Sequence, residues 1–170
     1  MNMNTITKIA LSIVVAFSAL YPYLFPSEKS GSLETVFGAG IVGAIAIAIV
    51  FFTAIAIYCK ALQKCLELIH PSNRMANPTS VWYMFLLPYN FIEDFFIILN
   101  VSKSIENEAK NNDKLSVLKD YGVVTGIGWC IAQVLSLIPN YGGQIAGGIG
   151  LILWIIHWVF IHKTIRLLTR

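Results

Sequence analysis

Four long apolar stretches constrain what this chain can fold into. Each approaches or reaches the roughly 20 residues that a helix needs to cross a bilayer core about 30 Å thick. Since 56% of the 170 residues are apolar and only 12% are charged, a soluble core of this size could not bury them all. The sequence therefore predicts a single all-α integral membrane domain over residues 1–170, with four transmembrane helices. The stretches run approximately over residues 9–25, 36–58, 121–138 and 144–161.

A fifth hydrophobic run, residues 81–101, is interrupted by polar side chains and by Pro88. Proline has no amide hydrogen, so a helix must break or kink there. From Phe91 onward apolar residues can share one helical face, while Asn90 and Asp94 lie one turn apart on another. We expect an amphipathic helix that is interfacial or re-entrant, with its acidic edge toward water or toward the bundle.

The distribution of positive charge distinguishes four membrane crossings from five, because short loops rich in Lys and Arg stay on the cytoplasmic side. With four crossings, only Lys29 of the twelve Lys and Arg residues faces outward. With five, the cluster from Lys103 to Lys119 and the C-terminal tail would both lie outside. We therefore expect a multi-pass protein with both termini cytoplasmic. The net charge of +3 follows from the same rule, so no nucleic-acid partner is expected.

The first apolar run has a second interpretation as a cleaved signal peptide, with Lys8 as its basic flank and residues 16–18 as a cleavage site. The run continues beyond that site to Phe25, and Tyr21 and Tyr23 near its end fit an aromatic belt at the membrane surface. These features favour a retained membrane anchor.

Small residues recur at four-residue steps inside the apolar stretches. In lipid, close backbone approach draws helices together, so such residues mark helix contacts. The turn at Pro139 is very short, and the last two stretches should therefore form a tight antiparallel hairpin. Packing within one chain and self-association into a homo-oligomer remain alternatives for these faces. The residues expected at helix contacts are Gly40, Ala44, Ala48, Gly122, Gly126, Gly143, Ala146, Gly147 and Gly150.

Two familiar patterns are interpreted as packing rather than chemistry. Residues 38–43 satisfy the G-x-G-x-x-G spacing of a dinucleotide loop, but they lead into a membrane helix without a preceding strand. Cys59, Cys65 and Cys130 have no zinc-site spacing, and their expected positions argue against a disulfide framework. We therefore expect no cofactor and no bound metal.

Ionisable side chains at membrane depth are the candidates for function, because a charge in hydrocarbon costs several kcal/mol. Glu93, Asp94 and Asn90 are candidates for contact with an ion or a pore, and a hydrated helix edge is the competing interpretation. Glu93 and Asp94 point about 100° apart on a helix and do not form an acid and base pair. His157 is the candidate polar site inside the last span, against a simple hydrogen bond to a neighbouring backbone. It lies about 140° around the helix from His162, so a shared metal is not expected.

The polar segment Ser102–Asp120 alternates Lys with acidic residues. A solvated cytoplasmic connector is the simpler interpretation, and a docking surface for a soluble partner is the alternative. Glu106 and Lys103 can lie on one solvated helical face.

Three motifs follow one another between residues 77 and 162: N-P-T-S-V-W (77–82), a basic Ser-containing segment (101–106) and W-I-I-H-W (154–158). In this order they resemble small bacterial inner-membrane proteins with an N-P-x-x-V-W opening and a W-I-I-Y-W-like last helix. The resemblance implies a bacterial inner-membrane location with the C-terminal hairpin, and it implies no activity. His157 stands where that pattern has Tyr.

Function is predicted only as a class. The leading hypothesis is a non-enzymatic membrane module, oligomeric and pore-like or accessory to another protein, because the sequence offers no catalytic constellation. A small transporter is the second hypothesis, although a polar midplane site and inverted repeats are not evident. An intramembrane enzyme is the third, and it would require a cluster of nucleophile, acid or metal ligands that the sequence does not offer. A membrane immunity or anchoring partner of a soluble protein is a further alternative. The expected partners are the lipid bilayer, further copies of the chain, and a soluble or membrane protein.

Overall fold

The computed structural model of the chain describes residues 5–24 and 40–169, and for residues 18, 19, 21–24 and 41 it describes the backbone alone. Every regular element in the described part is helical, which confirms the predicted all-α fold. The expectations for Lys29, for the aromatic side chains at 21, 23 and 25, and for the start of the second stretch at residues 36–39 lie outside this description. The elements are α1 (Thr5–Leu24), α3 (Gly40–Leu68), η1 (Pro71–Asn73), η2 (Pro78–Phe85), α4 (Asn90–Ala109), η3 (Asp113–Leu115), α5 (Val123–Leu135) and α6 (Tyr141–Thr169).

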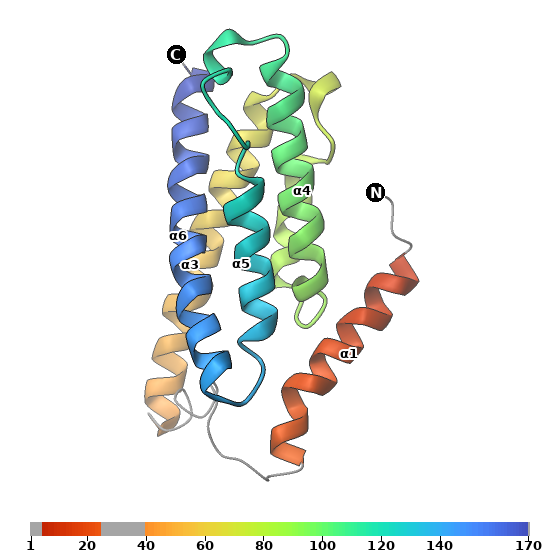
Figure 1. Cartoon of the computed structure of the whole chain (residues 1–170), viewed down its shortest axis with the longest axis vertical. Helices are drawn as coiled ribbons and strands as arrows, with labels where there is room; N and C mark the ends of the chain where they lie inside the picture. The colour runs from red at the N-terminus through yellow and green to blue at the C-terminus, as the bar shows by residue number, and fades with distance from the viewer. Residues whose placement is uncertain (1–4, 25–39, 170) are drawn as a thin grey trace.

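Helices α3, α4, α5 and α6 stand roughly parallel or antiparallel in one bundle, and α1 leans obliquely against the α4 side (Figure 1). Helices α5 and α6 pack against each other as an antiparallel pair, as expected from the short turn at Pro139. The loops on either side of η1 and η3 lie at the same end of the bundle as the end of α6 (Figure 1). That shared end carries most of the described Lys and Arg residues.

Two described helices are long and apolar enough to cross a bilayer: the part of α3 from Val42 to Leu68, and all of α6. The apolar part of α1, Thr5–Phe17, and the 13 residues of α5 are shorter. A helix of 13 residues spans only about 20 Å. The predicted third span, residues 121–138, therefore contains a helix that is shorter than the span itself.

The segment between α3 and α5 forms a hairpin of its own. The eight-residue 3-10 helix η2 runs from the charged end of the bundle toward its middle, the chain turns at residues 86–89, and α4 runs back to the same end (Figure 1). Asn77 caps η2, because its side chain accepts a hydrogen bond from the amide of Thr79 at 3.1 Å. The predicted interruption at Pro88 is confirmed, since η2 ends at Phe85 and α4 begins at Asn90. We call Pro78–Ala109 the η2–α4 hairpin.

Burial is uneven along the bundle. The second half of α3 buries one face, with Tyr58, Leu62 and Leu66 at the core, whereas its first half exposes a continuous apolar surface. Isoleucine side chains along α6 are also exposed. Apolar patches of this extent are rare on water-facing proteins and mark contact with lipid or protein. Exposed large apolar residues on α3 include Val42, Ile45, Ile49, Val50 and Phe51, and those on α6 include Ile145, Ile149, Ile152, Ile155 and Ile156.

Candidate functional site

The first turns of α4 lie at about the middle of the bundle and carry the predicted polar residues (Figure 1). Glu93 and Asp94 are only 8% and 2% exposed, and Asn90 is also buried. The competing prediction of a hydrated helix edge is therefore wrong for this fold. The reason is that α4 is covered by α1 on one side and by α5 on another, so its acidic edge faces the bundle.

Glu93 has a counter-charge. Lys8 of α1 donates to its Oε2 atom at 2.7 Å, and the two side chains are only 14% and 11% exposed. The same ammonium lies 4.0 Å from the centroid of the Phe96 ring, a favourable cation–π position. Ser12 adds a weaker contact between the same elements, donating to the carbonyl oxygen of Tyr89 at 3.4 Å. Glu93 therefore joins α1 to α4 as half of a neutral pair.

Asp94 faces the other way, toward α5. Gln133 donates its side-chain amide to Asp94 Oδ2 at 3.2 Å, while Asp94 Oδ1 has no hydrogen-bond partner in the described part of the chain. No described Lys or Arg lies within ion-pair distance of Asp94. The opposite directions of Glu93 and Asp94 agree with their expected separation around the helix.

Asn90 lies one turn before Asp94 on the same face of α4. Its Oδ1 atom is buried and has no hydrogen-bond partner among the described residues. Two neighbouring buried oxygens thus lack a donor. Such groups are rare in folded proteins and call for an explanation at each site.

His157 lies fully buried on α6 and pairs with α3 rather than with a backbone group. Its Nδ1 atom shares a 2.8 Å hydrogen bond with the Tyr58 hydroxyl, and its Nε2 atom has no partner in the described structure. Aromatic rings surround Tyr58 edge-on with centroids about 6 Å away: those of Trp129, Trp154, Trp158 and His157. Tyr58 also interacts electrostatically with Asp94, so the two buried polar groups belong to one region. We call Tyr58, Asn90, Asp94, Gln133 and His157 the polar interior.

Glycine makes room for this interior. A Cβ atom on Gly126 would run into Ile98 and lie 3.0 Å from the His157 ring, and one on Gly122 would lie 2.7 Å from Phe160. Gly143 and Gly150 of α6 likewise face the end of α5. Among the described residues, a Cβ atom on Gly40 would meet nothing within 4 Å, and Ala48 is exposed, while Ala44 between them is partly buried.

The predictions for the histidines and cysteines, that they bind no metal and form no disulfide framework, concern residues in or near the polar interior. Trp158 donates its indole N–H to His162 Nε2 at 3.0 Å, while His157 faces Tyr58, so the two histidines point to different partners. Within residues 5–24 and 40–169 no group of three His, Cys, Asp or Glu side chains is arranged to hold a metal ion. Cys59, Cys65 and Cys130 are buried free thiols.

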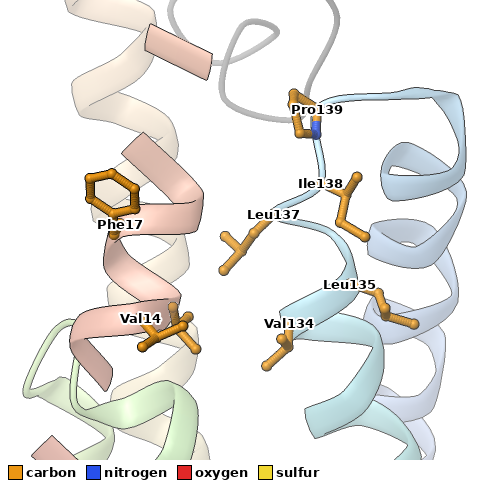
Figure 2. Close-up of a pocket in the computed structure, with 8 residues that line it drawn as sticks. Val14, Phe17, Val134, Leu135, Leu137, Ile138 and Pro139 are labelled. Atoms are coloured by element: carbon orange, nitrogen blue, oxygen red, sulfur yellow. The ribbon is translucent and has the colours of Figure 1, made fainter. Parts of the chain in front are cut away.

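A separate pocket of about 560 Å³ lies between α1 and the end of α5 (Figure 2). Aliphatic side chains, one phenyl ring and Pro139 form its wall, and none of the described residues that line it has a polar side chain. Its lining residues are Val14, Val15, Phe17, Val134, Leu135, Leu137, Ile138 and Pro139.

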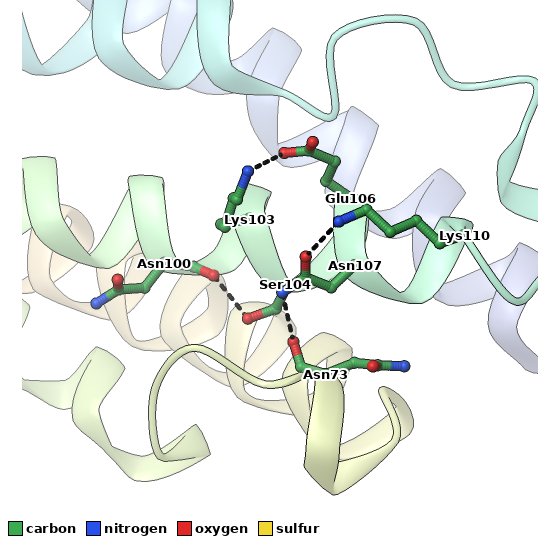
Figure 3. A network of polar contacts seen from close by, with 7 residues as sticks. All are labelled: Asn73, Asn100, Lys103, Ser104, Glu106, Asn107 and Lys110. Carbon is green, nitrogen blue, oxygen red and sulfur yellow. Dashed lines mark hydrogen bonds and ion pairs between the residues drawn. The ribbon is translucent and has the colours of Figure 1, made fainter. Parts of the chain in front are cut away.

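The charged end of α4 has a different character. Ser104 accepts a hydrogen bond from the Met75 amide at 2.8 Å and donates to the carbonyl oxygen of Asn100 at 2.6 Å, as part of the network in Figure 3. Glu108 accepts from the amide of His70 and from the side chain of Asn73. This part of the predicted Ser102–Asp120 connector is thus a packed helix end that holds the loop of residues 70–77.

One face of that helix end is solvated, as expected. Lys103 and Glu106 form an exposed pair at 2.9 Å (Figure 3). The hydrogen bond from Lys103 lowers the pKa of the Glu106 carboxyl below its ordinary value.

Sequence reasoning missed three partners in these contacts. Gln133 carried a visible signal, because it is a polar amide inside an otherwise apolar stretch. Tyr58 carried none, since it ends an apolar stretch and counts as an interfacial aromatic residue. Lys8 was considered only as a flanking charge, and its pairing with a residue 85 positions away could not be read from spacing.

Comparison with known proteins adds no relative: no protein-family model, no curated protein and no solved structure matches this chain.

Proposed function

We infer that the protein is a non-enzymatic, multi-pass module of the bacterial inner membrane that assembles as a homo-oligomer and passes cations through the polar interior at Asp94. The observation that carries this proposal is a buried carboxylate with an open oxygen and no counter-charge among the described residues, inside a bundle with an apolar outer surface. A carboxyl group at such a site has an oxygen that can bind and release a cation, and it carries no positive charge that would attract an anion.

The membrane location is supported by surface and by charge. Helices α3 and α6 could span a bilayer by length and composition, and their exposed surfaces are largely apolar. The described loops rich in Lys and Arg gather at one end of the bundle, as the positive-inside rule requires of a cytoplasmic face (Figure 1). In this orientation α1, α3, α5 and α6 are the four transmembrane helices, and both termini are cytoplasmic.

The η2–α4 hairpin is the re-entrant element of the proposal. It begins and ends at the cytoplasmic face, and its turn at residues 86–89 lies at membrane depth, with Leu86 and Leu87 exposed to lipid. Irregular backbone is tolerated at this depth where protein covers it, and η2 is held to α3 by a hydrogen bond from Trp82 to Gln63.

Self-association is supported by the uncovered half of α3. Its small residues Gly40, Ala44 and Ala48 follow one another at four-residue steps, and none of the described helices packs over Gly40 or Ala48. Small residues at this spacing allow close helix contact in lipid. A second copy of the chain is the proposed neighbour.

A small transporter is the second candidate, and the enclosure of Asp94 favours it. Asp94 is 2% exposed within a single chain, so an ion could reach it only after the helices move. A pore gives currents of many ions per opening, whereas a transporter gives a slow flux without unitary steps. Single-channel recording therefore separates the two candidates.

The test is planar-bilayer recording of the purified protein under a pH gradient and, separately, under a KCl gradient. Wild-type protein should give a cation-selective current. The combined change Lys8→Met, Glu93→Gln and Asp94→Asn, which leaves no member of the Lys8–Glu93 pair unpaired, should lower the selectivity while the oligomer remains intact. The matched control is Glu106→Gln with Asp113→Asn, which neutralises two carboxylates at the charged end and should leave the current unchanged. A wild type without current or flux would overturn the proposal and favour the accessory or immunity role, in which the charged end binds a soluble partner.

A further inference from the structure

Among the described carboxylates, Asp94 is the one that is buried and has no positively charged partner. Glu93 beside it is paired with Lys8, and Glu106 and Glu108 have donors at the charged end. An isolated carboxylate in an apolar interior is costly enough that it takes up a proton instead of remaining charged. The partners of its two oxygens therefore decide what Asp94 binds.

The donor set around Asp94 is poor for a metal cation. Ions such as Ca²⁺ and Mg²⁺ need about six oxygen ligands. Here Asp94 Oδ2 already accepts from Gln133, and the open oxygens are Asp94 Oδ1 and Asn90 Oδ1. The neighbouring thiols of Cys59 and Cys130 are unsuited to hard cations. A proton needs only one open oxygen, and Asp94 Oδ1 provides it.

The groups that face Asp94 come from every element around the first turns of α4. None of them is a cation free to balance its charge, because the ammonium of Lys8 is bound to Glu93 at 2.7 Å. The remaining charged residues of α4 and of its loops lie at the far, charged end of the helix. The facing titratable or polar groups are Tyr58 and Cys59 of α3, Glu93 of α4, Cys130 and Gln133 of α5, and, through Tyr58, His157 of α6.

We propose that Asp94 is a proton-binding site buried in the membrane, with its Oδ1 atom as the acceptor and Gln133 as the residue that positions the carboxyl group. On uptake, a proton from water forms an O–H bond at Oδ1 and the carboxylate becomes a neutral carboxylic acid. On release the same bond breaks and the proton returns to water. Asn90, one turn earlier on the same helix face and with its Oδ1 atom lacking a donor among the described residues, is the proposed acceptor for that O–H group. The proposal rests on the proposed function and names its cation as the proton.

Infrared difference spectroscopy of the purified full chain tests this directly, because a protonated carboxyl has a stretching band that ionised carboxylates lack. Wild-type protein at neutral pH should show one such band per chain, shifted by exchange into D₂O. Asp94→Asn should abolish it. Lys8→Met with Glu93→Gln, which removes the adjacent buried carboxylate together with its counter-charge, should retain it. A band that survives Asp94→Asn, or one that disappears with the Lys8→Met and Glu93→Gln double change instead, would overturn the assignment.

A second variant keeps the test decisive if Asp94→Asn folds poorly. Gln133→Leu removes the donor to Asp94 Oδ2 and should move the frequency of the band without abolishing it. An unchanged frequency would contradict the positioning role of Gln133. Replacing choline chloride with NaCl should leave the band unchanged, and its loss in Na⁺ would show that the site binds a metal cation.

The infrared measurement is independent of ion transport, so its outcome can be separated from that of the proposed function. A protonated Asp94 in a protein without current or flux would support the proton-binding site and contradict the proposed function. A cation current in a protein whose Asp94 stays ionised would support the proposed function and contradict the proton-binding site.

Discussion

The two halves of α4 carry similar polar side chains but differ in how many of them have hydrogen-bond or ion-pair partners. In the half near residues 100–109, Ser104 and Glu108 have partners from the loop of residues 70–77. In the half near residues 90–94, Glu93 has a charged partner, while Asn90 and Asp94 each keep a buried oxygen to which no described residue donates. Pairing, rather than residue type, therefore separates the structural half of this helix from its candidate functional half.

This contrast explains why the charge pattern of α4 alone does not show which of its polar residues are functional. Hydrogen bonds at the charged end hold a loop in place and are replaceable by water. Polar groups in the interior have no water to replace a missing hydrogen-bond partner. An unpaired polar group there therefore lowers the stability of the fold more than one at the surface, which makes a functional role a reasonable hypothesis for it. Ser102 is the exception at the charged end, since its buried hydroxyl also lacks a partner, and nothing in the structure explains it.

The largest expected effect on stability comes from removing the counter-charge of Glu93, which leaves it unpaired like Asp94. Lys8→Met removes the counter-charge and leaves a buried carboxylate alone, which should destabilise the contact between α1 and α4 by about 3 kcal/mol. The free energy of unfolding in mixed micelles measures this loss. The double change Lys8→Met with Glu93→Gln should recover most of it, because no buried charge is then left unpaired. Wild-type stability in the single variant would show that the pair contributes nothing.

Packing around His157 should give the next largest effect. Gly126→Ala places a methyl group against Ile98 and the imidazole ring, and overpacking of this kind costs about 2 kcal/mol. Gly148→Ala is the matched control, since a Cβ atom there meets nothing within 4 Å. Thermal unfolding of the two variants compares them. Equal melting temperatures would contradict the close approach of α5 to α6.

A smaller effect is expected from Asp94 itself. Asp94→Asn replaces a neutral acid with a neutral amide of the same shape, so the free energy of unfolding should change by less than about 1 kcal/mol. Ser104→Ala, at the other half of the helix, should cost about 1 kcal/mol through two lost hydrogen bonds without affecting ion flux. A large loss of stability with Asp94→Asn would mean that Asp94 is a structural residue and would remove the contrast.

The smallest effect belongs to the exposed pair. Lys103→Ala should leave the melting temperature unchanged, because exposed ion pairs contribute little. It should, however, raise the pKa of Glu106 toward its ordinary value, since the lysine hydrogen bond that favours the ionised carboxylate is gone. NMR titration of the Glu106 carboxyl measures this shift. An unchanged pKa would show that the pair does not persist in solution.

Hydropathy and proline were enough to predict the all-helical fold and the interruption at Pro88. These features act locally, because apolar length and a missing amide hydrogen constrain the backbone wherever they occur. The candidate residues Asn90, Glu93, Asp94 and His157 were likewise visible as polar groups within apolar runs.

Their partners were not visible. The sequence left open whether the acidic edge of α4 faces water or the bundle, and that depends on α1 and α5 closing over it. The bonds from Lys8 to Glu93 and from Tyr58 to His157 join residues 85 and 99 positions apart. Such pairs are set by tertiary packing, which spacing along one chain does not encode.

The central claim is that the η2–α4 hairpin enters and leaves the membrane on one side and so carries Asp94 into the interior. Single cysteines introduced at Thr79, Leu87 and Lys110 test it, with a membrane-impermeant thiol reagent applied from each side. The unmodified chain is the control, because its described cysteines are buried. Labelling of positions 79 and 110 from the cytoplasmic side, with position 87 protected from both sides, is the predicted result. Labelling of positions 79 and 110 from opposite sides would show that the segment crosses the membrane and would contradict the account.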